Sequence, residues 1–135
     1  MAAVSVEIPP RSPYVGVVRL ALAALGRASG LDEEQVDELK IAVGEACVNS
    51  VLAHEAAGSD EAVLVEFDDD GSTITVQVSD RAGNVERIGA PAEVDSQGFS
   101  SRLAFSVALL QSLVDECSFD ARDGGGLVTT LAFRH

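Results

Sequence analysis

The sequence predicts an α+β fold, a two-layer sandwich in which a mixed, mostly antiparallel sheet is covered on one face by three helices. Segments with the two-residue alternation of strands are joined by tight turns, which is typical of antiparallel sheets. Three longer segments carry the apolar spacing of amphipathic helices that pack on such a sheet. The chain has 135 residues, the size of one ordinary domain, so we expect residues 1–135 to form a single domain.

The first elements are a strand and a helix. The alternating segment Val4–Ile8 precedes two prolines and predicts an edge strand. Ser12 can then cap a helix that has Pro13 at its first position, and Gly26 and Gly30 mark its end. The apolar stripe of this helix consists of Val15, Val18, Leu22 and Leu25.

A long helix and a hairpin follow. Asp32 with Gln35 three residues later resembles a capping box, which opens the long helix. Two alternating segments on either side of a turn then predict a pair of antiparallel strands. The predicted bounds are Asp32 to His54 or Glu55 for the helix, Val63–Asp68 and Ile74–Asp80 for the strands, and Asp70-Gly71 for the turn.

The last part of the chain begins with a long irregular segment. Periodicity disappears over Arg81–Gly98, and loops of this length inside a compact domain are often lids or binding loops. A helix is then predicted over Ser100–Val114. The strands Cys117–Ala121 and Leu127–Phe133 follow, joined by the turn Asp123–Gly126.

The charge of the chain restricts its partners. The formal net charge is -13, with only nine lysine and arginine residues. Binding to a phosphate backbone draws on such basic side chains, so we expect no direct contact with nucleic acid. A basic protein partner fits the charge, and an acidic surface that serves solubility alone fits it equally well.

The two cysteines and the apolar segments indicate the compartment. Cys47 falls within the long helix and Cys117 begins an apolar alternation, so two buried free thiols are expected rather than a disulfide or a metal pair. The N-terminal segment lacks an apolar signal core, and Arg19 and Arg27 interrupt the only long apolar stretch. We therefore expect a cytoplasmic protein with no membrane segment.

Glu45 and Asn49 are a polar pair one turn apart in the long helix. At about 100° per residue, Ile41, Val48 and Leu52 project in the same sector, so the pair is predicted to face the core rather than water. Burial of unsatisfied polar groups is costly, which indicates a further partner there, such as a ligand, a metal or another side chain.

Asp80 is predicted to lie close to this pair. It ends the strand whose alternation places Ile74, Val76 and Val78 on one face, and it shares their parity. A long helix that covers this face would bring Glu45 and Asn49 to the same place. Three polar groups are then expected to converge under one helix.

These features resemble one known superfamily. The segment Glu45–His54, which reads EACVNSVLAH, the strand ending at Asp80 and the loop that precedes the last helix are similar to the GHKL (Bergerat-fold) ATPases. The greatest similarity is to their small single-domain branch, the RsbW-like anti-sigma factor serine kinases. The resemblance covers nearly the whole chain and implies the Bergerat fold, with ATP or ADP and Mg²⁺ as ligands.

The resemblance implies a role for each of the three polar residues. Asn49 would offer its side-chain oxygen to the Mg²⁺ that bridges the nucleotide phosphates. Glu45 would be the general base that takes the proton from an attacking serine hydroxyl or water. Asp80 would accept a hydrogen bond from the exocyclic amine of adenine, which distinguishes adenine from guanine.

The chain departs from the family pattern at its glycines. The family continues its aspartate as D-x-G-x-G, and a glycine-rich phosphate loop opens its last helix. The aligned segments here read Asp80-Arg81-Ala82-Gly83-Asn84, with Ala104 and Ser106 at the later glycine positions. Lost glycines with positive φ weaken such a loop by about 1 to 2 kcal/mol each.

Some residues near these positions could still contact the nucleotide. Gly83 and Ser106 lie at or beside the glycine positions, and Arg81, Arg87 and Arg102 are the basic residues of the lid region. The arginines could compensate for the lost glycines or be solvated surface charges. We count Gly83, Ser106, Arg81 and Arg102 as candidate nucleotide-binding residues beside Asn49 and Asp80.

Other features carry weaker functional signals. His54 lies about 140° around the helix from Asn49, so we interpret it as a helix-end residue. The glycines at 124–126 join two strands and are interpreted as a hairpin turn rather than a phosphate cradle. The sequence has no metal-binding Cys/His spacing, nucleophile elbow or Walker-type loop.

Two function hypotheses remain. The first is an anti-sigma factor that sequesters a sigma factor and is controlled by an anti-anti-sigma (STAS) antagonist, which it phosphorylates on serine with ATP. The second is a partner-binding module of the same fold whose nucleotide site has decayed. The resemblance also implies a possible homodimer, whereas the catalytic domain of a sensor kinase fits less well because no phosphoacceptor helix is present in the sequence.

Overall fold

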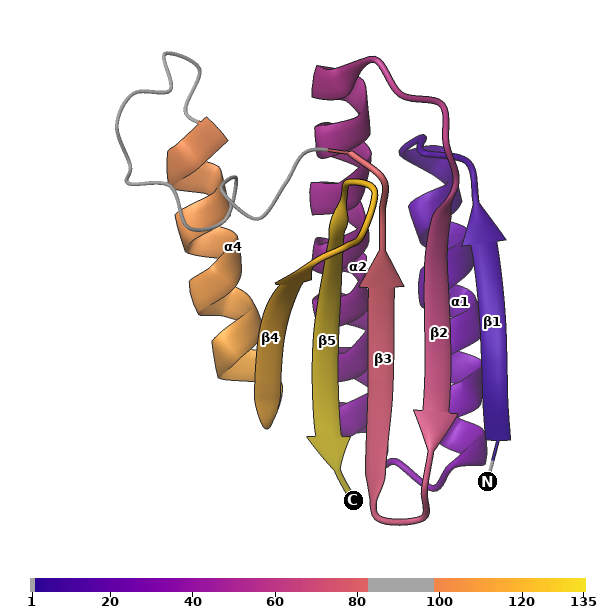
Figure 1. Cartoon of the computed structure of the whole chain (residues 1–135). Helices are drawn as coiled ribbons and strands as arrows, with labels where there is room; N and C mark the ends of the chain where they lie inside the picture. Colours follow the sequence, from indigo (N-terminus) through magenta and orange to yellow (C-terminus); the bar gives the residue numbers. More distant parts are fainter. Residues whose placement is uncertain (1, 83–98) are drawn as a thin grey trace.

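The computed structural model describes residues 2–82 and 99–135, which form three helices and five strands. In chain order these are β1 (Ala2–Ile8), α1 (Pro13–Ala28), α2 (Glu33–Ala57), β2 (Val63–Asp69), β3 (Thr73–Ser79), α4 (Phe99–Leu113), β4 (Glu116–Ala121) and β5 (Leu127–Arg134) (Figure 1).

The five strands form one sheet in the order β1-β2-β3-β5-β4, and each neighbouring pair is antiparallel. In Figure 1, α1 and α2 lie behind this sheet and α4 lies beside its β4 edge. The long helix α2 contacts β2, β3 and β5 and also both other helices, α1 contacts β1, and α4 contacts β4. The predicted α+β sandwich of a sheet and three helices is confirmed.

The core lies between the sheet and the helix layer. In β3, the alternating residues Ile74, Val76 and Val78 are buried, as their spacing predicts. The intervening Thr75 and Gln77 are half-buried and project to the opposite face. Strand β3 therefore has one apolar face, and the helix layer covers it.

Helix α1 differs from the prediction at both ends. Pro13 is at its start, but the Ser12 side chain makes no capping hydrogen bond. The backbone of Ser12 is already helical (φ -50°, ψ -41°), whereas a capping side chain needs an extended residue. Gly26 lies inside the helix rather than at its end, and a Cβ there would lie 2.9 Å from Cδ2 of Leu39. This glycine therefore permits the close packing of α1 against α2.

Helix α2 begins as predicted. Oδ1 of Asp32 accepts a hydrogen bond from the Gln35 backbone N–H at 2.8 Å, and Oε1 of Gln35 accepts one from the Asp32 N–H at 3.0 Å. The capping box is confirmed. The helix continues to Ala57, slightly further than predicted, because Gly58 provides the left-handed residue (φ +66°) that ends it.

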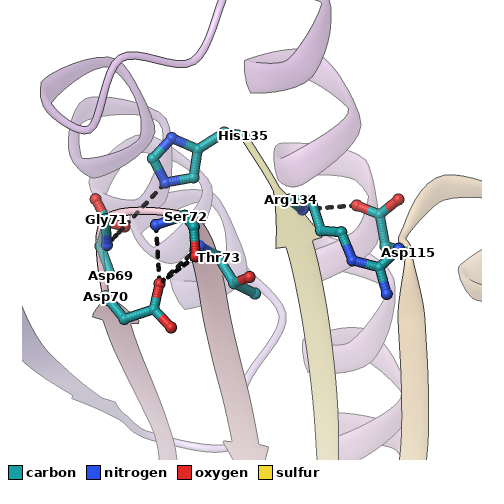
Figure 2. A network of polar contacts seen from close by, with 8 residues as sticks. All are labelled: Asp69, Asp70, Gly71, Ser72, Thr73, Asp115, Arg134 and His135. Atoms are coloured by element: carbon teal, nitrogen blue, oxygen red, sulfur yellow. Dashed lines mark hydrogen bonds and ion pairs between the residues drawn. The ribbon is translucent and has the colours of Figure 1, made fainter.

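The β2–β3 turn and the C-terminal residues form a polar network (Figure 2). It lies at the start of β3, whereas Asp80 follows the end of that strand. Oδ1 of Asp70 accepts hydrogen bonds from the backbone N–H groups of Ser72 (2.9 Å) and Thr73 (2.8 Å). Nε2 of His135 lies 2.9 Å from Oδ1 of Asp69. The predicted turn at Asp70-Gly71 is confirmed, and the end of β5 is tied to it.

Two further expectations concern the cysteines and the membrane. Both thiols are free; Cys47 is buried and Cys117 is half-buried. Burial raises the pKa of the Cys47 thiol to about 12, which makes this side chain an inert part of the core. In the part of the chain that the structure describes, no helix is both long enough and apolar enough to cross a membrane.

Candidate functional site

Asn49 is a residue of α2, and its side chain lies between α2 and α4. Its side chain is 6% exposed, and Nδ2 donates a hydrogen bond to Oγ of Ser106 at 2.6 Å. Oδ1 is buried and has no hydrogen-bond partner among the described residues. A buried acceptor without a partner costs about 1 to 3 kcal/mol, so this oxygen is a candidate to bind a ligand.

Reversing the orientation of the carboxamide would still leave one of its two polar atoms without a partner among the described residues. A hydroxyl both donates and accepts, so Ser106 can bond to either end of the amide group. In both orientations one polar atom of Asn49 stays bound to Ser106 and the other stays unpaired. With Nδ2 on Ser106, the unpaired atom is an oxygen, the ligand type that Mg²⁺ prefers.

Glu45 lies one turn before Asn49 and is half-buried. The predicted apolar sector around this pair is partly wrong, because Ile41 is 50% exposed and Val48 and Leu52 are only half-buried. The pair lies on the flank of α2 toward α4, while the fully buried face of α2 carries other residues. Asn49 is therefore buried under α4, whereas Glu45 is only half-buried.

Asp80 is 1% exposed and is held by neighbouring residues. Oδ2 accepts a hydrogen bond from Oγ of Ser50 at 2.8 Å. Oδ1 accepts bonds from the backbone N–H groups of Ala82 (3.1 Å) and Leu127 (3.2 Å). Ser50 follows Asn49 directly, so this contact confirms that α2 and the end of β3 meet as predicted.

Ser50 was not recognised from the sequence. Its position gives a signal that could have found it: it lies in the middle of the apolar face of α2, where a hydroxyl needs a partner. Asp80 provides that partner. The hydrogen bond between them accounts for a serine on the buried face of the helix and for a buried carboxylate at the end of the neighbouring strand.

His54 has a larger part in the site than its predicted position at the helix end indicates. It lies in the last turn of α2 and is completely buried. Nε2 accepts a hydrogen bond from the Arg81 backbone N–H at 3.3 Å, and Nδ1 lies 2.9 Å from Oγ of Ser59. Because Nε2 accepts, Nδ1 carries the proton in this arrangement. His54 thus fixes the backbone that directly follows Asp80.

The turn between β4 and β5 supports Asp80 from the other side. Its three glycines join the two strands, so the predicted hairpin turn is confirmed. Gly126 has φ +106°, and a Cβ there would lie 2.0 Å from the carbonyl oxygen of Asp80. Nη1 of Arg122 donates to the same oxygen at 3.2 Å. Neither contact is predicted by the sequence, because neither residue is near Asp80 in the chain.

The remaining predicted residues divide into two groups. Arg81 is exposed and Ala82 is 2% exposed directly beyond Asp80, and Ser106 is fully buried on α4. Gly83 lies outside the described residues, as does the side chain of Arg102. The structure therefore brings Asn49 to Ser106 and Asp80 to Ser50, and it leaves the predicted roles of Gly83 and Arg102 untested.

This fold, with a buried asparagine on the long helix and an aspartate after the central strand, defines a class of nucleotide-binding domains. Residues 8–133 match the family of the histidine kinase-like ATPase domain, and the chain belongs to this family. The resemblance to the GHKL superfamily is confirmed.

The relatives are serine-protein kinases. The chain is 30% identical over 129 residues to the serine-protein kinase RsbW of Bacillus pumilus, a match of 90% of this chain and 80% of that protein. It is 28% identical over 134 residues to the RsbW of Listeria innocua, covering 94% of this chain and 85% of the relative.

Two solved structures share the fold. The crystal structure of the RsbU and RsbW domains of Rv1364c from Mycobacterium tuberculosis has a TM-score of 0.74 at 18% identity, covering 99% of this chain and 32% of that one. The SiaB protein–SiaC complex from Pseudomonas aeruginosa gives a TM-score of 0.71 at 14% identity, covering 96% of this chain and 88% of the other. The chain thus spans about a third of the first structure and most of the second.

Proposed function

We propose that this protein is an anti-sigma factor that sequesters a sigma factor and phosphorylates a STAS-type antagonist on serine with ATP. The observation that carries the proposal is the buried Oδ1 of Asn49, which has no partner in residues 2–82 and 99–135, beside a half-buried Glu45. An ATP site needs a hard oxygen for Mg²⁺ and a nearby carboxylate base, and these two residues provide them. The similarity to serine-protein kinases named RsbW supports serine as the acceptor.

Each residue would have one role. Oδ1 of Asn49 would hold the Mg²⁺ that neutralises the nucleotide phosphates. Glu45 would take the proton of the serine hydroxyl as its oxygen bonds to the γ-phosphorus and the bond to the β–γ bridging oxygen breaks. The carboxylate of Asp80 would accept a hydrogen bond from the adenine amine. Hydrogen bonds from Ser50, Ala82 and Leu127 hold this carboxylate in place.

A second function is favoured by the same surroundings of Asp80. Its carboxylate already accepts bonds from one side chain and two backbone groups of the protein. Ala82 is buried where the family pattern has a glycine. These features suit a nucleotide-independent module that binds its partners by surface contacts alone.

Calorimetry of Mg-ATP and Mg-ADP binding distinguishes the two functions. The proposed kinase binds both, and Asn49→Ala weakens binding in the presence of Mg²⁺ because it removes the metal ligand. Asp80→Asn weakens binding with or without the metal because it removes the acceptor for adenine. If the wild-type protein gives no heat of binding at millimolar nucleotide, the proposed kinase function is excluded and the partner-binding function is supported.

Phosphotransfer is the second test. The protein is incubated with ATP and a STAS-domain protein, and phosphoserine is detected by mass spectrometry. Glu45→Gln should keep nucleotide binding and lose transfer by about 100-fold or more, since it removes the base and preserves the size of the side chain. Transfer at the wild-type rate by this variant would exclude Glu45 as the base.

A further inference from the structure

Ser106 and Asn49 form a buried polar pair between two helices. Oγ of Ser106 lies 2.6 Å from Nδ2 of Asn49, and Ser106 is completely buried while Asn49 is 6% exposed. The residues are separated by 57 positions in the chain, so only the packing of α4 on α2 brings them together. This contact uses one end of the Asn49 carboxamide and leaves Oδ1 without a partner in the part of the chain that the structure describes.

The position of Ser106 is set by the core rather than by the loop before it. Leu110, one turn later on α4, is completely buried in the main apolar cluster and so projects from the same side of the helix. Packing of Leu110 holds this face of α4 against α2. The hydroxyl of Ser106 is thereby presented to Asn49 at a fixed place.

A carboxamide is planar, so fixing one end orients the other. If Nδ2 is held by Ser106, rotation of the Asn49 amide is restricted and Oδ1 keeps one direction. Partners that orient a metal ligand in this way change metal affinity by about 10- to 100-fold when they are removed. The Ser106 hydroxyl is completely buried, so its bond to Asn49 is part of the helix interface and not a contact on the surface.

We infer that Ser106 is a positioning residue that orients Oδ1 of Asn49 toward the Mg²⁺ of a bound nucleotide. The inference rests on the proposed ATP site, and it changes the predicted role of Ser106 from a direct nucleotide contact to one that acts through Asn49. It also explains why a serine can stand where the family pattern has a glycine: the hydroxyl is satisfied by Asn49.

The test measures ATP affinity by calorimetry with Mg²⁺ and with EDTA, and compares the ratio of the two dissociation constants. In Ser106→Ala, the factor by which Mg²⁺ increases the affinity for ATP should fall by about tenfold, and the affinity without metal should stay unchanged. The reason is that only the orientation of the metal ligand Asn49 is lost. Ser106→Thr restores the hydroxyl and should recover the ratio. Ser112→Ala, which removes an exposed serine hydroxyl of the same helix, is the matched control and should change nothing.

A double-mutant cycle separates positioning from a general loss of structure. In the Asn49→Ala background, Ser106→Ala should have no further effect on the magnesium ratio, because Ser106 acts only through Asn49. Thermal unfolding of each variant without nucleotide confirms that it is folded. The cycle does not use Ser106→Thr, so it still tests the inference if the extra methyl group of threonine does not fit the buried site.

Three results would overturn the inference. An unchanged magnesium ratio in Ser106→Ala, with a wild type that binds Mg-ATP, refutes the positioning role and leaves the proposed function intact. Tighter Mg-ATP binding by Ser106→Gly would show that the hydroxyl obstructs the nucleotide. A wild type that binds no nucleotide removes the proposed kinase and this inference together.

Discussion

Asp80 stabilises the fold with the same carboxylate that would select adenine. It accepts hydrogen bonds from Ser50, Ala82 and Leu127, and so joins α2, the segment after β3 and the start of β5. Bonds to a charged acceptor contribute about 1.5 to 3 kcal/mol each, and groups left unpaired in the interior add a penalty. A variant at this position therefore tests stability and binding at once.

Asp80→Ala is expected to lower the free energy of unfolding by more than about 3 kcal/mol, whereas Ser50→Ala, which removes one bond to the carboxylate, should cost about 1.5 to 3 kcal/mol. The alanine at 80 leaves three buried donors without an acceptor, and the alanine at 50 removes only one bond. Asp80→Asn keeps an oxygen for the two backbone groups and an amide that can donate to Ser50, so it should stay folded. Urea denaturation measures all three. Equal costs for the two alanine variants would contradict the central role of Asp80.

At the scale of the elements, local signals predicted most of the fold. The alternation in β3 and the capping box of α2 are short-range patterns, and both are present in the structure. Ser12 failed as a cap because its own backbone is helical, which no residue type reveals. The end of α2 depends on the left-handed Gly58 rather than on the last apolar residue.

The site was predicted less completely, for a physical reason. Helical spacing shows which residues share a face but not which neighbour covers it, so the flank toward α4 was taken for the core. The bonds of Asn49 to Ser106, of Ser50 to Asp80 and of His54 to Arg81 join residues distant in the chain. Such contacts follow from packing and have no signature in a single sequence.

The glycine turn between β4 and β5 gives a prediction at this scale. Gly126→Ala should lower stability by about 3 kcal/mol or more, since the new Cβ would lie 2.0 Å from the Asp80 carbonyl oxygen. Gly124 has φ +84° and open space around it, so Gly124→Ala should cost only about 1 to 2 kcal/mol for the backbone conformation. Thermal or urea unfolding of the two variants compares them directly. A larger loss at Gly124 would mean that the turn does not pack on Asp80.

The β2–β3 turn gives a second prediction, on acid stability. The Ser72 and Thr73 backbone N–H groups hold the pKa of Asp70 below its ordinary value, and the Gly71 N–H and His135 do the same for Asp69. A carboxylate with a lowered pKa stabilises the fold above its unfolded pKa of about 3.9, and this contribution is lost as the pH falls through the folded value.

Asp70→Asn and Asp69→Asn should therefore flatten the loss of stability in acid. The effect appears as a smaller fall of the urea midpoint between neutral pH and about pH 3, relative to the wild type. Asp120→Asn on the exposed strand β4 removes the same charge and serves as the control. An acid profile of Asp70→Asn that coincides with the wild-type profile would show that the turn does not depend on the ionised carboxylate.

At the scale of the whole molecule, the net charge of -13 influences how the protein associates with any charged partner. Like charges on one compact surface repel each other, and they attract a basic partner over distances up to about the Debye length of 10 Å at 0.1 M salt. The described basic residues near the site are few, with Arg81 exposed and Arg122 bound to the Asp80 carbonyl. The long-range field is therefore acidic, and it favours encounters with a basic partner.

The association rate with the proposed sigma factor should consequently fall as salt is added. Raising NaCl from about 0.05 M to about 0.5 M shortens the Debye length from roughly 14 Å to roughly 4 Å, and steered association commonly slows by tenfold or more over such a range. Stopped-flow fluorescence measures the rate, and the dissociation rate should change much less because short-range contacts control it. The stability of the free protein should rise with the same salt, since screening weakens its self-repulsion. If the association rate is independent of salt, the acidic surface serves solubility, and the partner is recognised by shape and apolar contacts alone.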